Sequence, residues 1–179
     1  MQYQQVLQFW FSELTEKDWF RKDERLDQTI TERFEGLLQA AGACELYDWR
    51  RTPDGRLAEI IVLDQFSRNI YRDKAMSFSQ DALALALAQE AVAIGADMAL
   101  PVSQRAFLYM PYMHSESLLI HEQAMKLFQQ TGLENNLNFE KRHLAILERF
   151  GRYPHRNAIL GRQSTPEEVE FLAQPGSSF

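Results

Sequence analysis

The 179-residue sequence is poor in several residue types, and each shortage excludes a class of protein. Its single cysteine, Cys44, allows no internal disulfide, which indicates a reducing compartment and predicts a cytoplasmic protein. In its small-residue stretch we expect this thiol to be a buried spacer. Lys and Arg number 19 against 25 Asp and Glu, so the net charge of −6 argues against general nucleic-acid binding.

Long apolar segments are also missing, which argues against membrane insertion and secretion. The N-terminus has neither a basic region nor a long apolar run, so we expect no signal peptide. The stretch of lowest polarity, residues 81–99, is mostly alanine and contains Gln89, Glu90 and Asp97. A packed helix explains this stretch better than a membrane span does.

The common catalytic and metal-binding motifs are absent too. His121-Glu122 is followed by Met125 where a zinc metalloprotease has its second histidine. His114 and His121 would lie roughly 10 Å apart along a helix, too far to share one metal ion. The sequence contains neither a Gly-x-Ser-x-Gly elbow nor a glycine-rich phosphate loop. We therefore expect no metal and no cofactor.

What the sequence does contain is helical periodicity. Apolar residues recur at three- and four-residue steps almost everywhere, whereas two-residue alternation is missing, so we predict an all-α fold. Asp23 is placed to cap a long amphipathic helix that fades near Trp49. The segment Thr52 to Gly55 breaks the pattern. The following helix is apolar on so many sides that it should be central.

Boundary signals continue through the second half of the chain. Ser77 and Gln80 have the spacing of a capping box that opens an alanine-rich helix, which Gly95 would close. Ser103 can cap a short helix that Pro111 stops or kinks.

Three further helices are expected beyond that proline. One begins near Ser115 and ends at Gly132, and another ends at Gly151. Thr165-Pro166-Glu167-Glu168 combines a Thr cap, a proline at the first helical position and a glutamate three residues on, so it should open the last helix.

Together these signals predict a single all-α domain over residues 1–179. It comprises N-terminal helices (1–50), a helical core with the polar motifs (51–173), and a frayed or lightly docked tail (174–179). Helix pairs joined by short turns favour an antiparallel bundle or an α-solenoid. An N-terminal aromatic cluster could bind a partner, but core packing is the preferred interpretation; its members are Phe9, Trp10, Phe11, Trp19 and Phe20.

Four motifs occupy residues 6–11, 63–72, 106–116 and 149–162. In this order they resemble those of the bacterial DUF924 family. Their similarity extends over nearly the whole chain and implies a small cytoplasmic protein with tetratricopeptide-like antiparallel helix hairpins in a compact α-superhelical bundle. The family has no assigned biochemical function. Where many relatives have a proline in the second motif, this chain has Ser67, and every charged member of the motif is present.

The charged residues of the second motif lie on a face that should be buried. Asp64 and Arg68 are one helical turn apart on an apolar stripe. Because buried charges must be paired, the first interpretation is a structural ion pair, extended by Arg72 or by the Arg152–Arg156 loop. The alternative is that the arginine side chains are only partly satisfied and bind a carboxylate or a phosphate.

Two histidines are candidates for chemistry. His114, beside Ser115-Glu116, is expected near a helix start, where it could act as acid, base or ligand, or simply cap the helix. His155 lies between arginines that disfavour its protonated form, so we expect a neutral imidazole. His121 and His143 look like ordinary partly buried or surface residues of helices.

Three functions remain open. The first is binding of a small anionic ligand or a peptide carboxylate in an Arg/His-lined groove. The second is a small hydrolase-type enzyme with His114, His155 or Glu116 as catalytic residue. The third is a protein–protein interaction module in which the polar network is purely structural. The predicted ligand-binding residues are Asp64, Arg68, Arg105, His114, Arg152, His155, Arg156 and Asn157.

Overall fold

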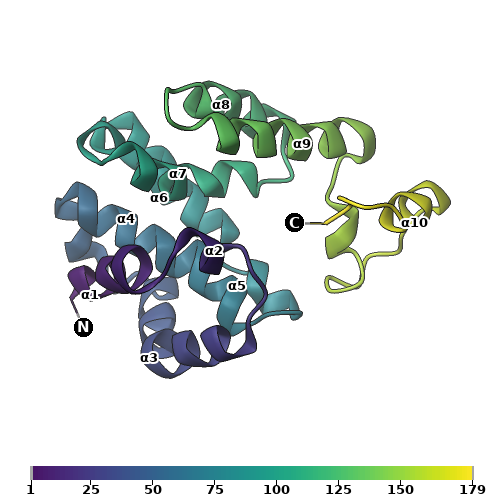
Figure 1. Ribbon diagram of the computed structural model, residues 1–179. Coiled ribbons are helices and arrows are strands. Elements are labelled where there is room, and N and C mark those ends of the chain that lie inside the picture. The colour runs from purple at the N-terminus through teal and green to yellow at the C-terminus, as the bar shows by residue number, and fades with distance from the viewer. Residues whose placement is uncertain (1, 179) are drawn as a thin grey trace.

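A computed structural model describes residues 2–178, and every regular element in that range is helical, as predicted (Figure 1). The π-helical turns η1 and η3 continue α1 and α4 without a break, whereas the 3-10 turns η2, η4, η5 and η6 lie in the connections between helices. The elements are α1 (Tyr3–Gln8), η1 (Phe9–Glu13), α2 (Glu16–Trp19), α3 (Glu24–Gly42), η2 (Tyr47–Arg51), α4 (Pro53–Ile61), η3 (Val62–Phe66), α5 (Ser67–Ile70), η4 (Ala75–Phe78), α6 (Asp81–Ala93), η5 (Ala96–Ala99), α7 (Val102–Met113), α8 (Leu118–Phe128), α9 (Glu134–Phe150), η6 (Pro154–Arg156) and α10 (Pro166–Leu172).

The continuous segment α4–η3–α5 is the centre of the molecule, which confirms the prediction of a central helix. Thr52 opens it by accepting a hydrogen bond from the Gly55 N–H, and Pro53 occupies the first turn. Residues of α4 and η3 are almost entirely buried, and α1, α3, α6 and α7 pack around them. The π turn η3 was not expected. Such turns widen a helix locally and often occur at functional sites.

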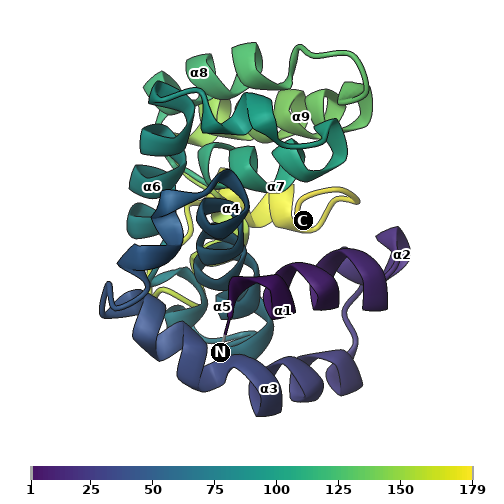
Figure 2. The same ribbon diagram turned by 90° about the vertical axis from the view of Figure 1, so that its left-hand side faces the viewer.

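Consecutive helices pack against each other in the second half of the chain. Helix α6 contacts α7, α7 contacts α8, and α8 contacts α9, so this half consists of helix hairpins (Figure 2). Apolar contact between neighbouring hairpins is what stabilises such an array. The all-α prediction is therefore confirmed, and the tetratricopeptide-like detail stays a prediction.

The N-terminal aromatic cluster belongs mainly to the core. Phe9 and Trp10 are buried, and Trp10 lies edge-on to Phe66 of the central segment, with ring centroids 5.6 Å apart. Phe11 and Trp19 pack on the same core from its rim, whereas Phe20 is exposed. Aromatic side chains of η1 thus fasten the N-terminal segment to the central helix.

The long N-terminal helix begins as predicted and ends early. Asp23 caps α3 by accepting hydrogen bonds from the N–H groups of Arg25 and Leu26. The helix ends at Gly42, seven residues before Trp49, because Cys44 takes a left-handed backbone conformation with φ of 59°. This turn directs the thiol to solvent, so the prediction of a buried Cys44 was wrong.

The opening of the alanine-rich helix α6 differs from the prediction. Gln80 makes no capping hydrogen bond, and the Ser77 hydroxyl donates instead to the Lys74 carbonyl within η4. The predicted capping box was wrong because η4 places Ser77 in its own tight turn. Gly95, with φ of 70°, follows the helix end as predicted.

Helix α7 also departs from the prediction at both ends. It begins at Val102, so Ser103 lies inside the helix and does not cap it. Pro111 lies in the last turn without ending the helix, which continues to Met113. The His114 N–H still donates to the Met110 carbonyl, so only the hydrogen bond that a residue at position 111 would donate is lost.

The next helices begin and end close to the predicted positions. Helix α8 starts at Leu118 and ends at Phe128, a few residues inside the predicted limits. Gly151 ends α9 in a left-handed conformation, as predicted. No helix among the described residues combines the length and apolar character that crossing a membrane requires.

The last helix lies to one side of the molecule, beyond the end of α9 (Figure 1). The predicted capping box is confirmed, because Thr165 and Glu168 each accept a hydrogen bond from the other's backbone N–H. Phe171 packs on Phe150 of α9 at 5.0 Å between ring centroids. The tail is docked as far as it is described, since the buried Ser177 donates to the Leu172 carbonyl; Phe179 lies outside the described residues.

Candidate functional site

A fully buried carboxylate, Asp64, lies in the π turn η3. Its Oδ1 accepts from His114 Nδ1 at 2.7 Å and lies 3.2 Å from Arg68 Nη1. Its Oδ2 accepts from the Gln65 side-chain amide at 2.6 Å. The predicted ion pair of Asp64 and Arg68 is thus present, and a histidine that the sequence did not connect to it completes the set.

The ion pair extends into a network, but not through Arg72. Arg68 donates to both carboxylate oxygens of Asp81, at 2.9 and 3.0 Å. Arg72 turns to the other side and pairs with Asp27 of α3. Asp81 is the first residue of α6 and was not among the site residues predicted from the sequence. Its carboxylate could not be recognised as a partner because the contact spans 13 residues of sequence.

His114 lies at the C-terminal end of α7, not at the start of a helix as predicted. Helix α8 begins only at Leu118, so the expected setting of free amides and a positive dipole end is absent at His114. Asp64 instead fixes the imidazole through Nδ1. Within the described part of the chain Nε2 makes no hydrogen bond, and with 17% of the side chain exposed it reaches solvent.

The charges around His114 decide its protonation state. Burial and the neighbouring Arg68 lower the pKa of His114 below its usual value. Burial alone would raise the pKa of Asp64, but the adjacent His114 and Arg68 lower it, so the carboxylate is ionised at neutral pH. The imidazole is then neutral, donates from Nδ1 to Asp64, and presents the Nε2 lone pair to solvent.

Arg156, from the polar loop of residues 151–162, is the second cation of the network. Its Nη2 donates to the His114 carbonyl at 2.9 Å, whereas its Nη1 is 3.5 Å from Asp81. Its guanidinium carbon lies 4.6 Å from the ring centroid of Phe78 and 4.8 Å from that of Tyr153. Burial and Arg68 lower the pKa of Arg156, and its buried Nε makes no hydrogen bond. This cation is therefore less well neutralised than Arg68.

A second ion pair fastens the polar loop beside this network. Glu116 accepts from the Tyr153 N–H at 2.7 Å and from Arg162 at 2.6 and 2.9 Å. The Tyr153 hydroxyl donates to the Met113 carbonyl at 2.6 Å. These bonds hold the loop against the α7–α8 junction. Both oxygens of Glu116 are occupied, which leaves this catalytic candidate in a positioning role.

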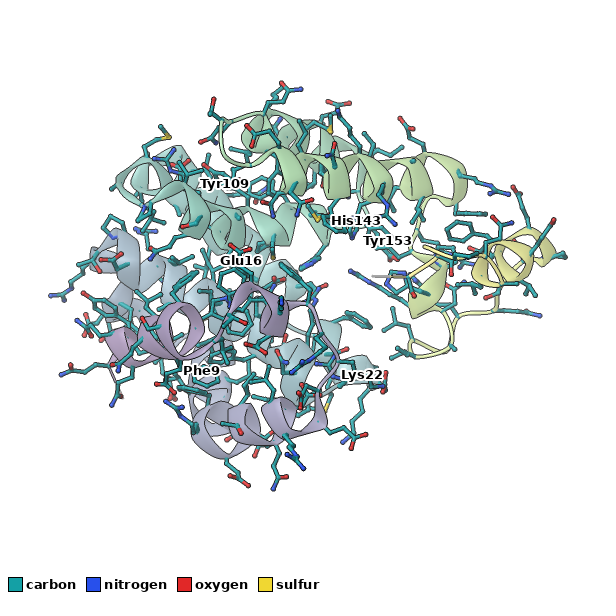
Figure 3. The ribbon with its side chains drawn as sticks, viewed as in Figure 1. Phe9, Glu16, Lys22, Tyr109, His143 and Tyr153 are labelled. Atoms are coloured by element: carbon teal, nitrogen blue, oxygen red, sulfur yellow. The ribbon has the colours of Figure 1, made fainter. Side chains whose placement is uncertain are left out.

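His121 and His143 are buried, which corrects the expectation of ordinary partly buried or surface residues. His121 is fully buried, bonds Glu140 of α9 through Nδ1, and donates from Nε2 to the Ser115 carbonyl. His143 packs edge-on to Tyr153 at 5.6 Å, and Figure 3 shows these two side chains together where α9 meets the polar loop. Burial lowers the pKa of His143 to about 3.

His155 is half-buried next to Tyr153, with ring centroids 5.6 Å apart. Burial and then Arg156 lower its pKa to about 4, so the expected neutral imidazole agrees with its surroundings.

Three predicted ligand-binding residues bond elsewhere. Arg105 is in the first turn of α7 and donates to the Leu100 and Met98 carbonyls, roughly 13 Å along the helix from His114. Arg152 forms two hydrogen bonds with Glu168 of α10, and Asn157 donates to the same carboxylate. The contacts of Arg152 and Asn157 with Glu168 fasten α10 to the polar loop.

The structure also contains a cavity of about 310 Å³ between α3 and the turn after α5. Its wall includes Lys22, Asp27, Asn69, Arg72 and Lys74, so it is separate from the network around His114. Among the described residues, no group of three or more His, Cys, Asp or Glu side chains has the geometry to hold a metal ion.

Comparisons with known proteins agree with the four sequence motifs. The family model described as bacterial protein of unknown function, DUF924, matches residues 6–176. The chain is also similar to the solved structure of a protein of unknown function from Agrobacterium tumefaciens, with 37% identity, 96% of each chain covered and a TM-score of 0.91. A comparison with curated proteins gave no match. Neither description names an activity.

Proposed function

The chain belongs to the DUF924 family, and from the geometry around His114 we propose that it binds a small carboxylate ligand. The observation that carries the proposal is the pairing of an open imidazole nitrogen with an incompletely neutralised guanidinium. His114 Nε2 faces solvent, and Arg156 is bonded directly to the backbone carbonyl of the same residue. A carboxylate that bridges the two groups would accept from the Arg156 guanidinium and from Nε2 in its protonated form, because an ionised carboxylate has no proton to donate.

Charge balance in the network favours a monoanion. Asp64 and Asp81 offset the charges of Arg68 and Arg156 when His114 is neutral. A phosphate dianion would need an excess of positive charge that this network does not supply. Protonation of His114 on binding adds one positive charge, which one carboxylate neutralises, and planar carboxylate oxygens match the N–H groups of a guanidinium.

The carboxylate can belong to a small organic acid or to the C-terminus of a peptide. The tetratricopeptide-like arrangement is part of this proposal, since stacked helix hairpins form concave surfaces suited to extended ligands. A single domain in the cytoplasm is the setting we propose, because one exposed thiol in 179 residues suits a reducing compartment.

A thermal-shift titration with succinate, inorganic phosphate and short peptides tests the proposal. A ligand at about 100 times its dissociation constant stabilises a protein by roughly 2.7 kcal/mol. For a chain of this size, each kcal/mol raises the melting temperature by about 2–4 °C. We expect carboxylates to produce this shift and phosphate to produce a smaller one.

Three variants locate the binding site. His114→Gln and Arg156→Gln should remove the carboxylate shift, while Arg51→Gln, at an exposed ion pair with Asp48, should retain it. A carboxylate shift that survives both site substitutions, or the absence of any shift in the wild-type protein, contradicts the proposal. The latter result would favour a structural network within a protein-interaction module.

A further inference from the structure

Building on the proposed carboxylate site, we propose that His114 is a general base that hydrolyses small esters carrying a carboxylate. The fixed orientation of the His114 imidazole is more than ligand binding alone would require. The ring is held by the hydrogen bond between Nδ1 and Asp64, while the backbone N–H of His114 donates to the Met110 carbonyl and its backbone carbonyl accepts from Arg156. The bond to Asp64 orients the ring, the two backbone bonds fix the position of the residue, and Nε2 is left as the ring nitrogen that can act as a base, which needs such an oriented lone pair.

The carboxylate behind the ring is itself held in place. Asp64 is completely buried and is bonded to Arg68 and Gln65 as well as to His114. It sits in the π turn η3, which places it opposite the end of α7. An ionised carboxylate at Nδ1 selects the tautomer with Nε2 unprotonated and stabilises the imidazolium that forms when Nε2 takes a proton. Asp64 is therefore a positioning residue in this proposal.

The reaction needs water as its only co-reactant. His114 Nε2 takes one proton from the water while the water oxygen forms a bond to the ester carbonyl carbon, and the carbonyl π electrons move to oxygen. The tetrahedral intermediate then re-forms the carbonyl and expels the alkoxide, which takes the proton from the His114 imidazolium. An ester and a water molecule thus yield a carboxylic acid and an alcohol, and the histidine is regenerated.

The role of Arg156 is to hold the substrate's second, unreactive carboxylate. Its contact with the His114 carbonyl fixes its distance from the base, so substrate binding and proton abstraction occur at adjacent groups. Holding the substrate in this orientation places its ester beside the His114 base, so the reaction no longer depends on a chance collision between the two groups in solution. An ester that lacks the carboxylate should accordingly be the poorer substrate.

The test measures para-nitrophenol release from the mono-para-nitrophenyl ester of succinic acid and from para-nitrophenyl acetate. We expect a higher kcat/KM for the succinate ester. His114→Gln should reduce that value by at least about 100-fold, the range typical of a lost general base. Arg156→Gln should raise KM for the succinate ester more than it lowers kcat, and Arg51→Gln should change neither value.

The pH profile tests the positioning role of Asp64. In the wild type, kcat/KM should rise with pH around a midpoint below the usual histidine pKa of 6.5 and then level off, because burial and Arg68 lower the pKa of His114. Asp64→Asn should lower the plateau and move the midpoint to lower pH, because Asp64 raises the pKa of the imidazole that it contacts; an unchanged midpoint would contradict the positioning role.

Failure of catalysis is distinguishable from failure of binding. Succinate binding without ester turnover, or turnover equal in wild type and His114→Gln, overturns the catalytic proposal and leaves the binding site intact. Turnover that shows no preference for the succinate ester is ordinary surface imidazole chemistry and also overturns it. Absence of both binding and turnover contradicts both proposals.

Discussion

Replacing Arg68 with alanine removes the cation that neutralises a fully buried carboxylate. Breaking a buried ion pair by deleting one partner costs about 3–5 kcal/mol. Asp64 keeps its bonds to His114 and Gln65 in the variant, and Asp81 is 20% exposed and can be hydrated. These factors place the loss of unfolding free energy at the lower end, near 3 kcal/mol, which corresponds to a fall of roughly 6–12 °C in melting temperature.

Urea denaturation followed by circular dichroism measures this loss directly. The matched control is Arg51→Ala, whose ion pair with Asp48 is exposed, so its unfolding free energy should change by no more than about 0.5 kcal/mol. Without Arg68, protonation of His114 can supply the missing charge, so the difference from wild type should shrink as the pH falls below 6.5. Equal stability of Arg68→Ala and Arg51→Ala would refute the assignment of Arg68 as the essential partner of Asp64.

Three further predictions concern stability. The pKa of His143 is about 3 in the folded protein against an ordinary 6.5, so between these pH values the unfolded chain binds more protons than the folded one. The stability that the neutral His143 contributes is therefore fully present above pH 6.5. It declines by about 1.4 kcal/mol per pH unit on acidification toward pH 3. His143→Gln should therefore flatten the pH dependence of the urea midpoint, and an unchanged slope would be inconsistent with a neutral buried imidazole. Gly36→Ala should stabilise the protein by about 0.5–1 kcal/mol, because, apart from its chain neighbours and the backbone of its own helix, no atom lies within 4 Å of the added carbon. Gly55→Ala should strongly destabilise it, because that carbon would lie 2.0 Å from the Trp49 carbonyl oxygen; similar melting temperatures for these two variants would contradict the packing of η2 on α4.

Helix formation was largely predictable because its signals are local. The Asp23 cap, the glycine ends at Gly95 and Gly151, and the Thr165 capping box each act within a few residues of sequence. The predicted helix boundaries were wrong where a tight turn replaced the expected helical conformation. The left-handed turn at Cys44 ended α3 early.

The candidate site was only partly predictable because its contacts join distant segments. The pair of Asp64 and Arg68 follows from helical spacing, but the bond from Asp64 to His114 spans 50 residues and that from Arg156 to the His114 carbonyl spans 42. A single sequence contains no signal for such partners. Asp81 was missed for the same reason.

The most direct test of the central claim is an NMR titration of the four histidine imidazoles with succinate, using His114→Gln to assign the His114 resonance. The account predicts that the His114 signal moves on addition of succinate and that its pKa rises, because a bound carboxylate stabilises the imidazolium. If the His114 signal and pKa stay unchanged at saturating succinate, the carboxylate site does not exist and the Asp64–His114–Arg156 arrangement is structural.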